Sequence, residues 1–216
     1  MKMKFFLMSA MASVMLSLGT QTAYAQCNKC VKNGHEKAAL MHALQNRKST
    51  RTFTKDVIPD SLLQDLLWAA NGVNRADGKR TAPSAINAQD IELYVAVNGK
   101  GSFHYDAQAK KLNKVMDEDF RTILSVQRPV YESPVNILLV TNQAKFKGFG
   151  AAMTLAAMDA GYVSQNICIF CAATGLGTVP CAPKMDAAAI QKMLGLSSDY
   201  IPLIYHPVGY PREPAK

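Results

Sequence analysis

The apolar segment from Gly150 to Thr174 restricts the fold of this chain more than any other part of its sequence. Its residues have helical spacing, but apolar or small side chains occur on nearly all sides, interrupted by Asp159, Gln165 and Asn166. Because such a helix has no polar face to present to water, it must be covered by other parts of a protein or by lipid. The three polar residues favour a protein core or an interface between chains over a membrane span.

The other patterned segments predict helices and strands in an irregular order. Helices are expected at Glu36–Asn46, Pro59–Ala70, Asp117–Val126 and Asp186–Leu194, and strands at Ile91–Val97, Ser102–Tyr105, Val135–Thr141 and Leu203–Val208. Ser61 and Gln64 would form a capping box near the start of the second helix. Since the order has no regular βαβ rhythm, the sequence predicts an α+β fold in one domain.

The N-terminus has the pattern of a secretory signal peptide. Lys2 and Lys4 precede an apolar run from Phe5 to Leu18, and Ala23-Tyr24-Ala25 supplies small residues for cleavage after about Ala25. The run is shorter than the ~20 residues that a membrane anchor needs. We therefore expect residues 1–25 to be removed, a flexible tail over residues 26–35, and an exported, periplasmic protein with no stable membrane span.

The chain has five cysteines, and an exported protein meets an oxidising compartment. Cys27 and Cys30 lie in the expected tail with the spacing of a redox motif. One alternative is that they form a local disulfide. The other is that the pair passes electrons to a cofactor, because soluble NAD(P)H is not expected as a donor outside the cytoplasm. Cys168 and Cys171 share one face of the long helix and are interpreted as packing residues. Neither the cysteines nor the four histidines have the spacing of a metal site.

The basic balance of the chain indicates an anionic ligand. The formal net charge is +8, and removal of Lys2 and Lys4 leaves +6. The sequence has no long Lys/Arg block with interleaved aromatics, so nucleic-acid binding is not predicted. A basic pocket for a phosphorylated cofactor explains the charge with fewer assumptions.

Four short segments carry side chains or backbone suited to such a ligand. Arg47-Lys48-Ser49-Thr50-Arg51 surrounds a hydroxyl with cations, as phosphate binding requires, although a solvated helix end would look similar. In Pro83–Gln89, Ser84 and Asn87 offer neutral donors and acceptors, or they bond only to their own loop. The glycines of Gly175–Cys181 allow close backbone approach, or simply end a helix. Gly209–Arg212 adds a last cation.

Together these segments resemble the nitroreductase family of flavin enzymes. The matching stretches are "RKSTR" (47–51), "PSAINAQ" (83–89), "DAGYVSQNI" continuing into "ATGLGTVP" (159–180), and "VGYPRE" (208–213), in the family's order. The stretch "GKRTAPSA…ELYV…FHYD" is most similar to the subgroup near the SagB-type dehydrogenases. The resemblance implies a central, mostly antiparallel sheet flanked by helices, in an intertwined homodimer whose core contains the long apolar helix.

The resemblance also implies FMN as the cofactor, within a domain of residues 36–216, and assigns residues to it. The phosphate and ribityl chain would be bound by Arg47, Lys48, Ser49, Arg51 and Arg212. Pro83, Ser84, Ala85 and Asn87 would reach the flavin from the other subunit. Val179, Pro180 and Cys181 would lie beside its reactive edge, with a packing role as the alternative for Cys181.

The function implied is that of an exported FMN-dependent oxidoreductase with no catalytic protein nucleophile and no metal. It would transfer electrons or hydride by a ping-pong mechanism from a thiol or another extracytoplasmic donor. The acceptor would be a small electron-poor molecule, such as a nitroaromatic, a quinone or a similar heterocycle. The alternatives are a non-catalytic flavin or small-ligand binding protein, and a thiol redox protein centred on Cys27 and Cys30.

Overall fold

The computed structural model describes residues 35–125, 127–182 and 185–212. The predicted signal peptide, Cys27 and Cys30 lie outside these residues. Helix α2 (His35–Asn46) crosses the boundary between two compact units, the first ending at His42 and the second beginning at Ala43. All other elements belong to the second unit, to which the following description applies.

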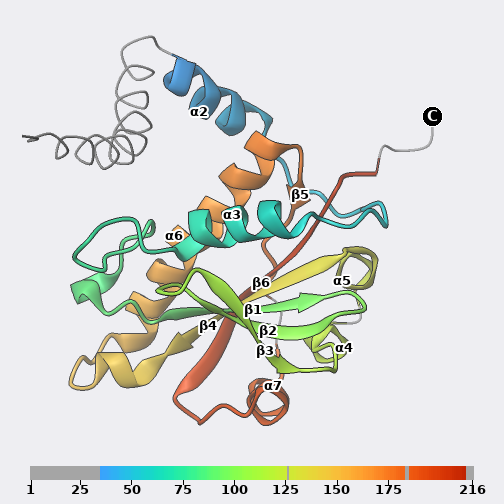
Figure 1. The fold of residues 1–216 in the computed structure, drawn as a ribbon. Coiled ribbons are helices and arrows are strands. Elements are labelled where there is room, and N and C mark those ends of the chain that lie inside the picture. Colours follow the sequence, from blue (N-terminus) through green and yellow to red (C-terminus); the bar gives the residue numbers. More distant parts are fainter. Residues whose placement is uncertain (1–34, 126, 183–184, 213–216) are drawn as a thin grey trace, which may run out of the picture. The chain divides into compact units, whose positions relative to one another are not determined.

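The second unit is built on one six-stranded antiparallel sheet (Figure 1). Its spatial order is β3-β2-β1-β4-β6-β5. The strands are β1 (Ile91–Val97), β2 (Gly101–Asp106), β3 (Lys111–Met116), β4 (Val135–Asn142), β5 (Gly177–Thr178) and β6 (Tyr200–Gly209). The predicted mostly antiparallel sheet in an α+β fold is confirmed, because every pair of neighbouring strands runs antiparallel.

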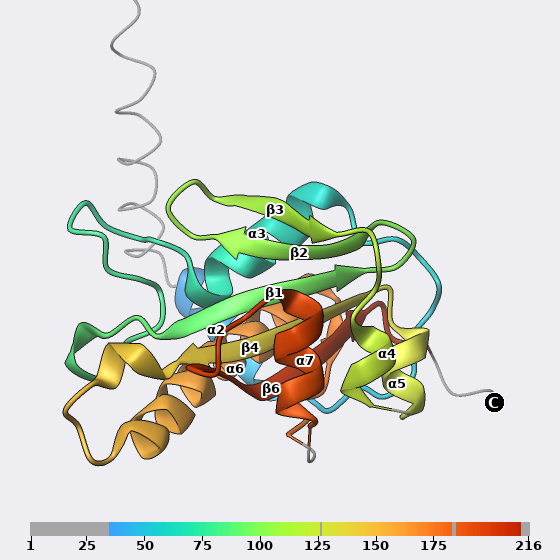
Figure 2. The ribbon, with the colours of Figure 1, turned by 90° about the horizontal axis from the view of Figure 1, so that it is seen from below.

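Helices cover both faces of this sheet. One face carries α3 (Asp60–Asn71) and the long α6 (Ala152–Thr174), and the other carries α4 (Arg121–Leu124), α5 (Arg128–Glu132) and α7 (Ala187–Leu194) (Figure 2). Two 3₁₀ turns, η1 (Ala85–Asn87) and η2 (Gln143–Phe146), precede β1 and follow β4. Among the described residues, no helix combines the length and hydrophobicity that crossing a bilayer requires.

The central strands divide their side chains between two cores. Successive residues of a strand point to opposite faces of the sheet. In β1, Leu93 and Val95 pack under α3 and α6, whereas Tyr94 and Ala96 pack under α4, α5 and α7. Strand β4 divides its side chains in the same way, and its residues are almost all buried. This explains why its sequence is continuously apolar instead of alternating.

Helix α6 is buried along only one side within the described chain. Its buried stripe comprises Ala156, Asp159, Ala160, Val163, Ser164, Ile167, Cys168 and Cys171, at helical spacing. Met153, Met158 and Tyr162 are exposed. The described residues therefore cover one side of α6, and Met153, Met158 and Tyr162 on its other side stay exposed within this part of the chain.

Several predicted boundaries are wrong for identifiable reasons. The expected helix Asp117–Val126 is reduced to the single turn of α4, which starts where the Asp119 carboxylate accepts the backbone N–H of Arg121 at 2.9 Å. Helix α3 begins at Asp60 behind Pro59, so Ser61 lies inside its first turn and cannot act as the N-cap of the predicted capping box. Strand β3 was missed because it is an exposed edge strand with little apolar patterning.

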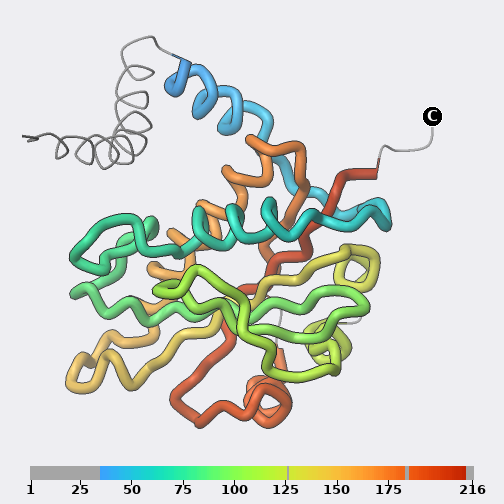
Figure 3. Tube along the Cα trace, in the orientation of Figure 1, coloured from blue at the N-terminus to red at the C-terminus, as the bar shows by residue number. Residues whose placement is uncertain are grey.

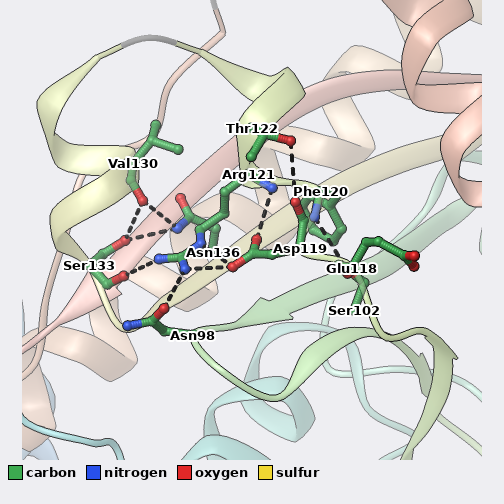
Figure 4. A network of polar contacts seen from close by, with 10 residues as sticks. All are labelled: Asn98, Ser102, Glu118, Asp119, Phe120, Arg121, Thr122, Val130, Ser133 and Asn136. Atoms are coloured by element: carbon green, nitrogen blue, oxygen red, sulfur yellow. Dashed lines mark hydrogen bonds and ion pairs between the residues drawn. The ribbon is translucent and has the colours of Figure 1, made fainter.

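Buried Arg121 joins the short helices α4 and α5 to the sheet through hydrogen bonds (Figure 4). Arg121 donates to the carboxylate of Asp119 at 2.7 Å, to the carbonyl of Ser133 at 2.8 Å and to the side-chain oxygen of Asn98 at 2.8 Å. The last contact joins α4 to the turn between β1 and β2. Because a buried charge needs its partners, this network specifies how α4 and α5 dock.

Candidate functional site

The predicted phosphate segment lies against the short strand β5. Ser49 and Thr178 form a parallel bridge, and the backbone N–H of Thr50 donates to the carbonyl of Thr178 at 2.9 Å. The approach is close, because a Cβ built on Gly177 would lie 2.6 Å from Cγ2 of Thr50. This contact therefore requires glycine at position 177. The sequence alone does not reveal this requirement.

A pocket of about 120 Å³ opens beside this contact. It is lined by Asn46, Arg47, Lys48, Thr50, Cys168, Cys171, Ala172, Gly175, Leu176, Thr178 and Pro211. Arg47 and Lys48 are exposed, and the ion pairs formed among the described residues include neither of them. The pocket thus combines two available cations with hydroxyl and backbone groups, which is the donor set that an anion such as a phosphate requires.

The two cysteines in this pocket are uncharged thiols at neutral pH. Burial raises the pKa of Cys168, although Arg47 acts in the opposite direction. Burial, with the neighbouring Cys168, raises the pKa of Cys171 still further. Both are free, so they fit the packing role expected for them and add no negative charge against an anionic ligand.

Cys181 is half-buried on the other side of β5. It exchanges two backbone hydrogen bonds of 2.9 Å with Tyr205 of β6. Burial raises the pKa of its thiol, while the Tyr205 hydroxyl and Arg51 oppose the change. Its neighbour Val179 is buried and Pro180 is exposed. A protonated thiol can line a flavin site without acting as a nucleophile.

Arg212 lies behind the phosphate segment. Its Nη2 donates to the carbonyl of Phe53 at 2.7 Å and lies 3.9 Å from Glu132. Residues 52–54 and residues 210–212 run side by side, bridged by Phe53 and Pro211 (Figure 3). Arg212 therefore supports the segment that carries the cations, and Pro211 is the residue of this stretch that lines the pocket.

The second predicted group, Pro83 to Asn87, lies elsewhere. It forms a tight turn in which Ile86 and Asn87 have φ values of 50° and 57°. The backbone N–H of Ala85 donates to both carboxylate oxygens of Asp159, at 3.0 and 2.9 Å. Ser84 accepts the backbone N–H of Gln89 at 2.9 Å. The local hydrogen bonding expected as one alternative for Ser84 is thus present.

One chain does not bring the two predicted groups together. The turn at 83–87 contacts α6 at Asp159, whereas the pocket contacts α6 at Cys168 and Cys171. At 1.5 Å of rise per residue, Asp159 and Cys171 are about 18 Å apart along the helix. Each group therefore forms its own part of the surface.

A buried histidine under the pocket was not assigned any role from the sequence. His206 of β6 is hydrogen-bonded through Nδ1 to Oγ1 of Thr178 at 3.1 Å and through Nε2 to Oγ of Ser164 at 2.9 Å. Burial lowers the pKa of His206 to about 3, so the ring is neutral. It links α6 to β5 below the pocket. Within the described residues, His, Cys, Asp and Glu side chains form no cluster that could bind a metal ion.

Comparison with known proteins agrees with this architecture. The family model for the nitroreductase family matches residues 44–210. A protein of Methanocaldococcus jannaschii that is described as a nitroreductase is 26% identical over 185 residues, which cover 81% of this chain and 92% of that protein.

Two solved structures show how far the likeness extends in space. A crystal structure from Ralstonia eutropha, also described as that of a nitroreductase, is 31% identical with a TM-score of 0.75, over 81% of this chain and 84% of that one. A structure described as an NADH oxidase from Clostridium acetobutylicum is 22% identical with a TM-score of 0.58, over 80% and 89%, and shows the shared fold.

Fold, pocket and relatives together define the class of protein as an α+β oxidoreductase. More particularly, the chain belongs to the nitroreductase family.

Proposed function

We propose that this chain is an exported, homodimeric FMN-dependent oxidoreductase that passes electrons or hydride from a donor to a small electron-poor acceptor. The observation that carries the proposal is the cationic pocket at Arg47 and Lys48, within a domain of the nitroreductase family. When bound, FMN supplies reversible two-electron chemistry at its ring, while the protein supplies binding, orientation and electrostatics.

The residues present fit the phosphate end of FMN. Arg47 can donate in a forked geometry, Lys48 acts as a point charge and Thr50 adds a hydroxyl group. The hydroxyl of Thr178 is already bonded to His206 and to the carbonyl of Pro207. Arg212 would act indirectly, by holding the Phe53 carbonyl next to this segment. The protonated thiols of Cys168 and Cys171 leave the positive potential of the pocket intact.

The pocket is too small to hold the whole cofactor. Its volume of about 120 Å³ is below the ~300–1,000 Å³ that encloses a drug-sized ligand. The isoalloxazine ring must then lie against further surface, and the exposed side of α6 with Met153, Met158 and Tyr162 is available for a second copy of the chain. Packing two α6 helices antiparallel would bring residues 83–87 of one subunit toward the pocket of its partner.

Donor and acceptor would use this site in turn, which gives ping-pong kinetics. The acceptor would be a nitroaromatic, a quinone or a related heterocycle. Export would separate the protein from soluble NAD(P)H, so the donor would be a thiol or another extracytoplasmic reductant, with Cys27 and Cys30 as the candidate entry point. Serine at both positions should then abolish turnover with a thiol donor, and unchanged turnover would refute that route.

The first test is the absorption spectrum of the purified protein and the mass of any released cofactor. A yellow protein that releases FMN at about one per chain supports the proposal, and reduction followed by reoxidation with a defined acceptor establishes catalysis. A colourless protein that also fails to take up added FMN refutes it.

Replacing a single cation tests the assignment of the phosphate pocket. We expect Lys48→Ala to weaken FMN binding by about tenfold or more, because it removes a charge-assisted contact. The measurement is titration of apoprotein with FMN by fluorescence quenching. Lys55→Ala, an exposed lysine outside the pocket, is the control and should bind FMN as the wild type does. Equal affinities for both variants would place the phosphate elsewhere.

A further inference from the structure

Two buried carboxylates meet beneath the turn at residues 83–87. Asp90 is 0% exposed and Asp159 is 1% exposed. Asp159 belongs to α6 and accepts the backbone N–H of Ala85 with both oxygens. Asp90 directly precedes β1, and its Oδ2 accepts the hydroxyl of Thr141 at 2.6 Å. Two acidic side chains are thus held at one place in the interior.

The placement of the two side chains favours a shared proton. Asp90 and Asp159 line the same small cavity of about 10 Å³, where a proton on one carboxyl group can be donated to the other. Among the hydrogen bonds of the described protein atoms, Oδ1 of Asp90 is buried without a partner. Two negative charges in contact would repel each other strongly in a medium of low dielectric. One proton between the groups removes the repulsion and satisfies the orphaned oxygen.

The surrounding charges decide which carboxyl holds the proton. Arg80 interacts electrostatically with Asp90 and donates to the carbonyl of Ile91 at 3.4 Å. Lys145 of η2 donates to the carbonyl of Gln89 at 2.8 Å. The groups contributed by α3 and β4, Asn71 and Thr141, are neutral. The cations therefore lie on the side of Asp90, and Asp159 has no cation of its own among these contacts.

Asp159 is left as the proton carrier. Burial and the adjacent Asp90 raise the pKa of Asp159 to about 6, although the Ala85 N–H acts to lower it. The two sites are coupled, so this value describes the pair as much as the single residue.

We propose that Asp90 and Asp159 share one proton, and that the protonated pair holds the loop Ser84–Gln89 in its left-handed conformation. Ile86, Asn87 and Gln89 all have positive φ, a strained conformation for residues other than glycine that needs compensating contacts. The bond from Ala85 to Asp159 is the contact that joins this loop to α6. Asp90 and Asp159 are thus positioning residues for the loop.

The consequence for the flavin rests on the proposed function, whereas the shared proton does not. If the loop reaches the flavin of the partner subunit, repulsion between the two ionised carboxylates above pH 6 would separate α6 from the start of β1 and disturb this wall of the site, although the Ala85 N–H bonds more strongly to an ionised Asp159. Affinity for FMN would then depend on pH through groups that do not touch the cofactor.

The sign of the effect on stability follows from the shift. In the unfolded chain Asp159 has its ordinary pKa of 3.8, and in the folded chain it retains a proton to about pH 6. The folded state therefore binds more protons between these values, so its stability falls as pH rises through this window. The shared proton contributes fully below pH 4 and nothing above about pH 7.

Asp159→Asn tests the shared proton directly. The amide oxygen can accept the Ala85 N–H, and the NH₂ can donate to Oδ1 of Asp90, so the variant mimics the protonated form at every pH. The measurement is the folding equilibrium constant from urea denaturation between pH 4 and pH 8. Because other groups also titrate in this range, the informative quantity is the ratio of variant to wild type at each pH.

We expect this ratio to rise by up to about tenfold per pH unit between pH 4 and 6 and then to level off. Asp65→Asn, which removes an exposed carboxylate from α3, is the matched control and should give a flat ratio. A flat or falling ratio for Asp159→Asn overturns the proposal.

Two further measurements keep the proposal testable if this variant does not fold. Infrared spectra of the wild type should contain a band of a buried, protonated carboxyl group that titrates near pH 6. Asp90→Asn, which also removes the repulsion, should lose that titration. Absence of the band in the wild type refutes the shared proton.

The flavin consequence is measured separately. FMN affinity of the wild type should fall above pH 6, whereas that of Asp159→Asn should stay constant from pH 5 to 8. If the stability ratios behave as expected but FMN does not bind, the shared proton stands and the proposed function fails. Equal pH profiles of FMN affinity for the two proteins would refute the coupling to the loop.

Discussion

At the scale of single residues, the chain contains two buried groups that respond to pH in opposite directions. Asp159 favours its protonated form and His206 favours its neutral form, each mainly because burial disfavours charge. The contribution of Asp159 to the stability of the fold decreases as pH rises, and that of His206 decreases as pH falls. Between about pH 4 and pH 6 the two contributions change with equal and opposite slopes, so together they should leave the stability of the protein nearly independent of pH in this window.

His206→Gln tests the second of these effects. The unfolded chain protonates its histidine near pH 6.5, whereas folded His206 resists protonation until about pH 3. The unfolded state therefore binds more protons in this window, and the contribution of His206 to the stability of the wild type should fall by up to about 1.4 kcal/mol for each pH unit as the pH decreases. Glutamine has no such titration, and it can still donate and accept hydrogen bonds.

The measurement is urea denaturation of variant and wild type from pH 7 to pH 4, with His42→Gln as the control at an exposed position. We expect the variant to be less stable at pH 7 and the difference to narrow toward pH 4. A difference that does not change with pH would mean that His206 is charged in the folded protein.

At the scale of elements, the contact between β5 and segment 49–51 connects the pocket to the sheet. We expect Gly177→Ala to reduce stability by about 1–3 kcal/mol, because the added methyl group would overlap Thr50 and separate Ser49 from Thr178. FMN affinity should fall as well. Denaturation and FMN titration are the measurements.

Gly150→Ala is the matched control for this change, since a Cβ at that position meets no atom within 4 Å in the described structure. Its stability and FMN affinity should stay close to wild type. If Gly177→Ala also behaves as wild type, the close approach of β5 is not required for the pocket.

The predicted elements show where sequence patterns suffice and where they fail. Strands β1 and β4 and helix α3 were predicted within a few residues, because burial on a sheet face or along a helix stripe produces a readable period. Strand β3 has no such signal, because its residues are largely exposed at an edge. Helix α4 is short because the Asp119 carboxylate and the Arg121 network define its start and its docking.

At the scale of the whole molecule, the uncovered side of α6 predicts association. Met158 is 52% exposed in the middle of this side. We expect Met158→Glu to prevent formation of the proposed dimer, because it would bury charges in the interface, and to weaken FMN binding with it. Sedimentation equilibrium gives the mass, and fluorescence titration gives the affinity.

Val115→Glu on β3 provides the matched control, because it adds the same charge at an apolar residue that is 40% exposed. It should leave both mass and affinity unchanged. A wild-type protein that is monomeric at micromolar concentration and still binds FMN would refute the proposed two-subunit site.

The candidate site was also only partly readable from the sequence. The types and order of Arg47, Lys48 and the segments around Gly177 indicated an anion site, and the structure gathers these residues around one pocket. The sequence could not tell that Arg212 donates to the Phe53 carbonyl, because that contact joins residues 159 positions apart. The role of His206 was hidden for the same reason.

By itself, the sequence determined the α+β class, the periodic elements and the residue types that mark the family. These properties are local, since each depends on neighbours a few positions away along the chain. The tertiary structure alone decided that α6 buries one side and leaves the other uncovered, and that Asp159 meets Asp90 beneath Ala85, a residue 74 positions away from Asp159. Such contacts depend on how the chain packs in three dimensions. In the sequence Asp159 is an isolated acidic residue in an apolar helix, and burial beside Asp90 makes it one member of the proposed proton-sharing pair.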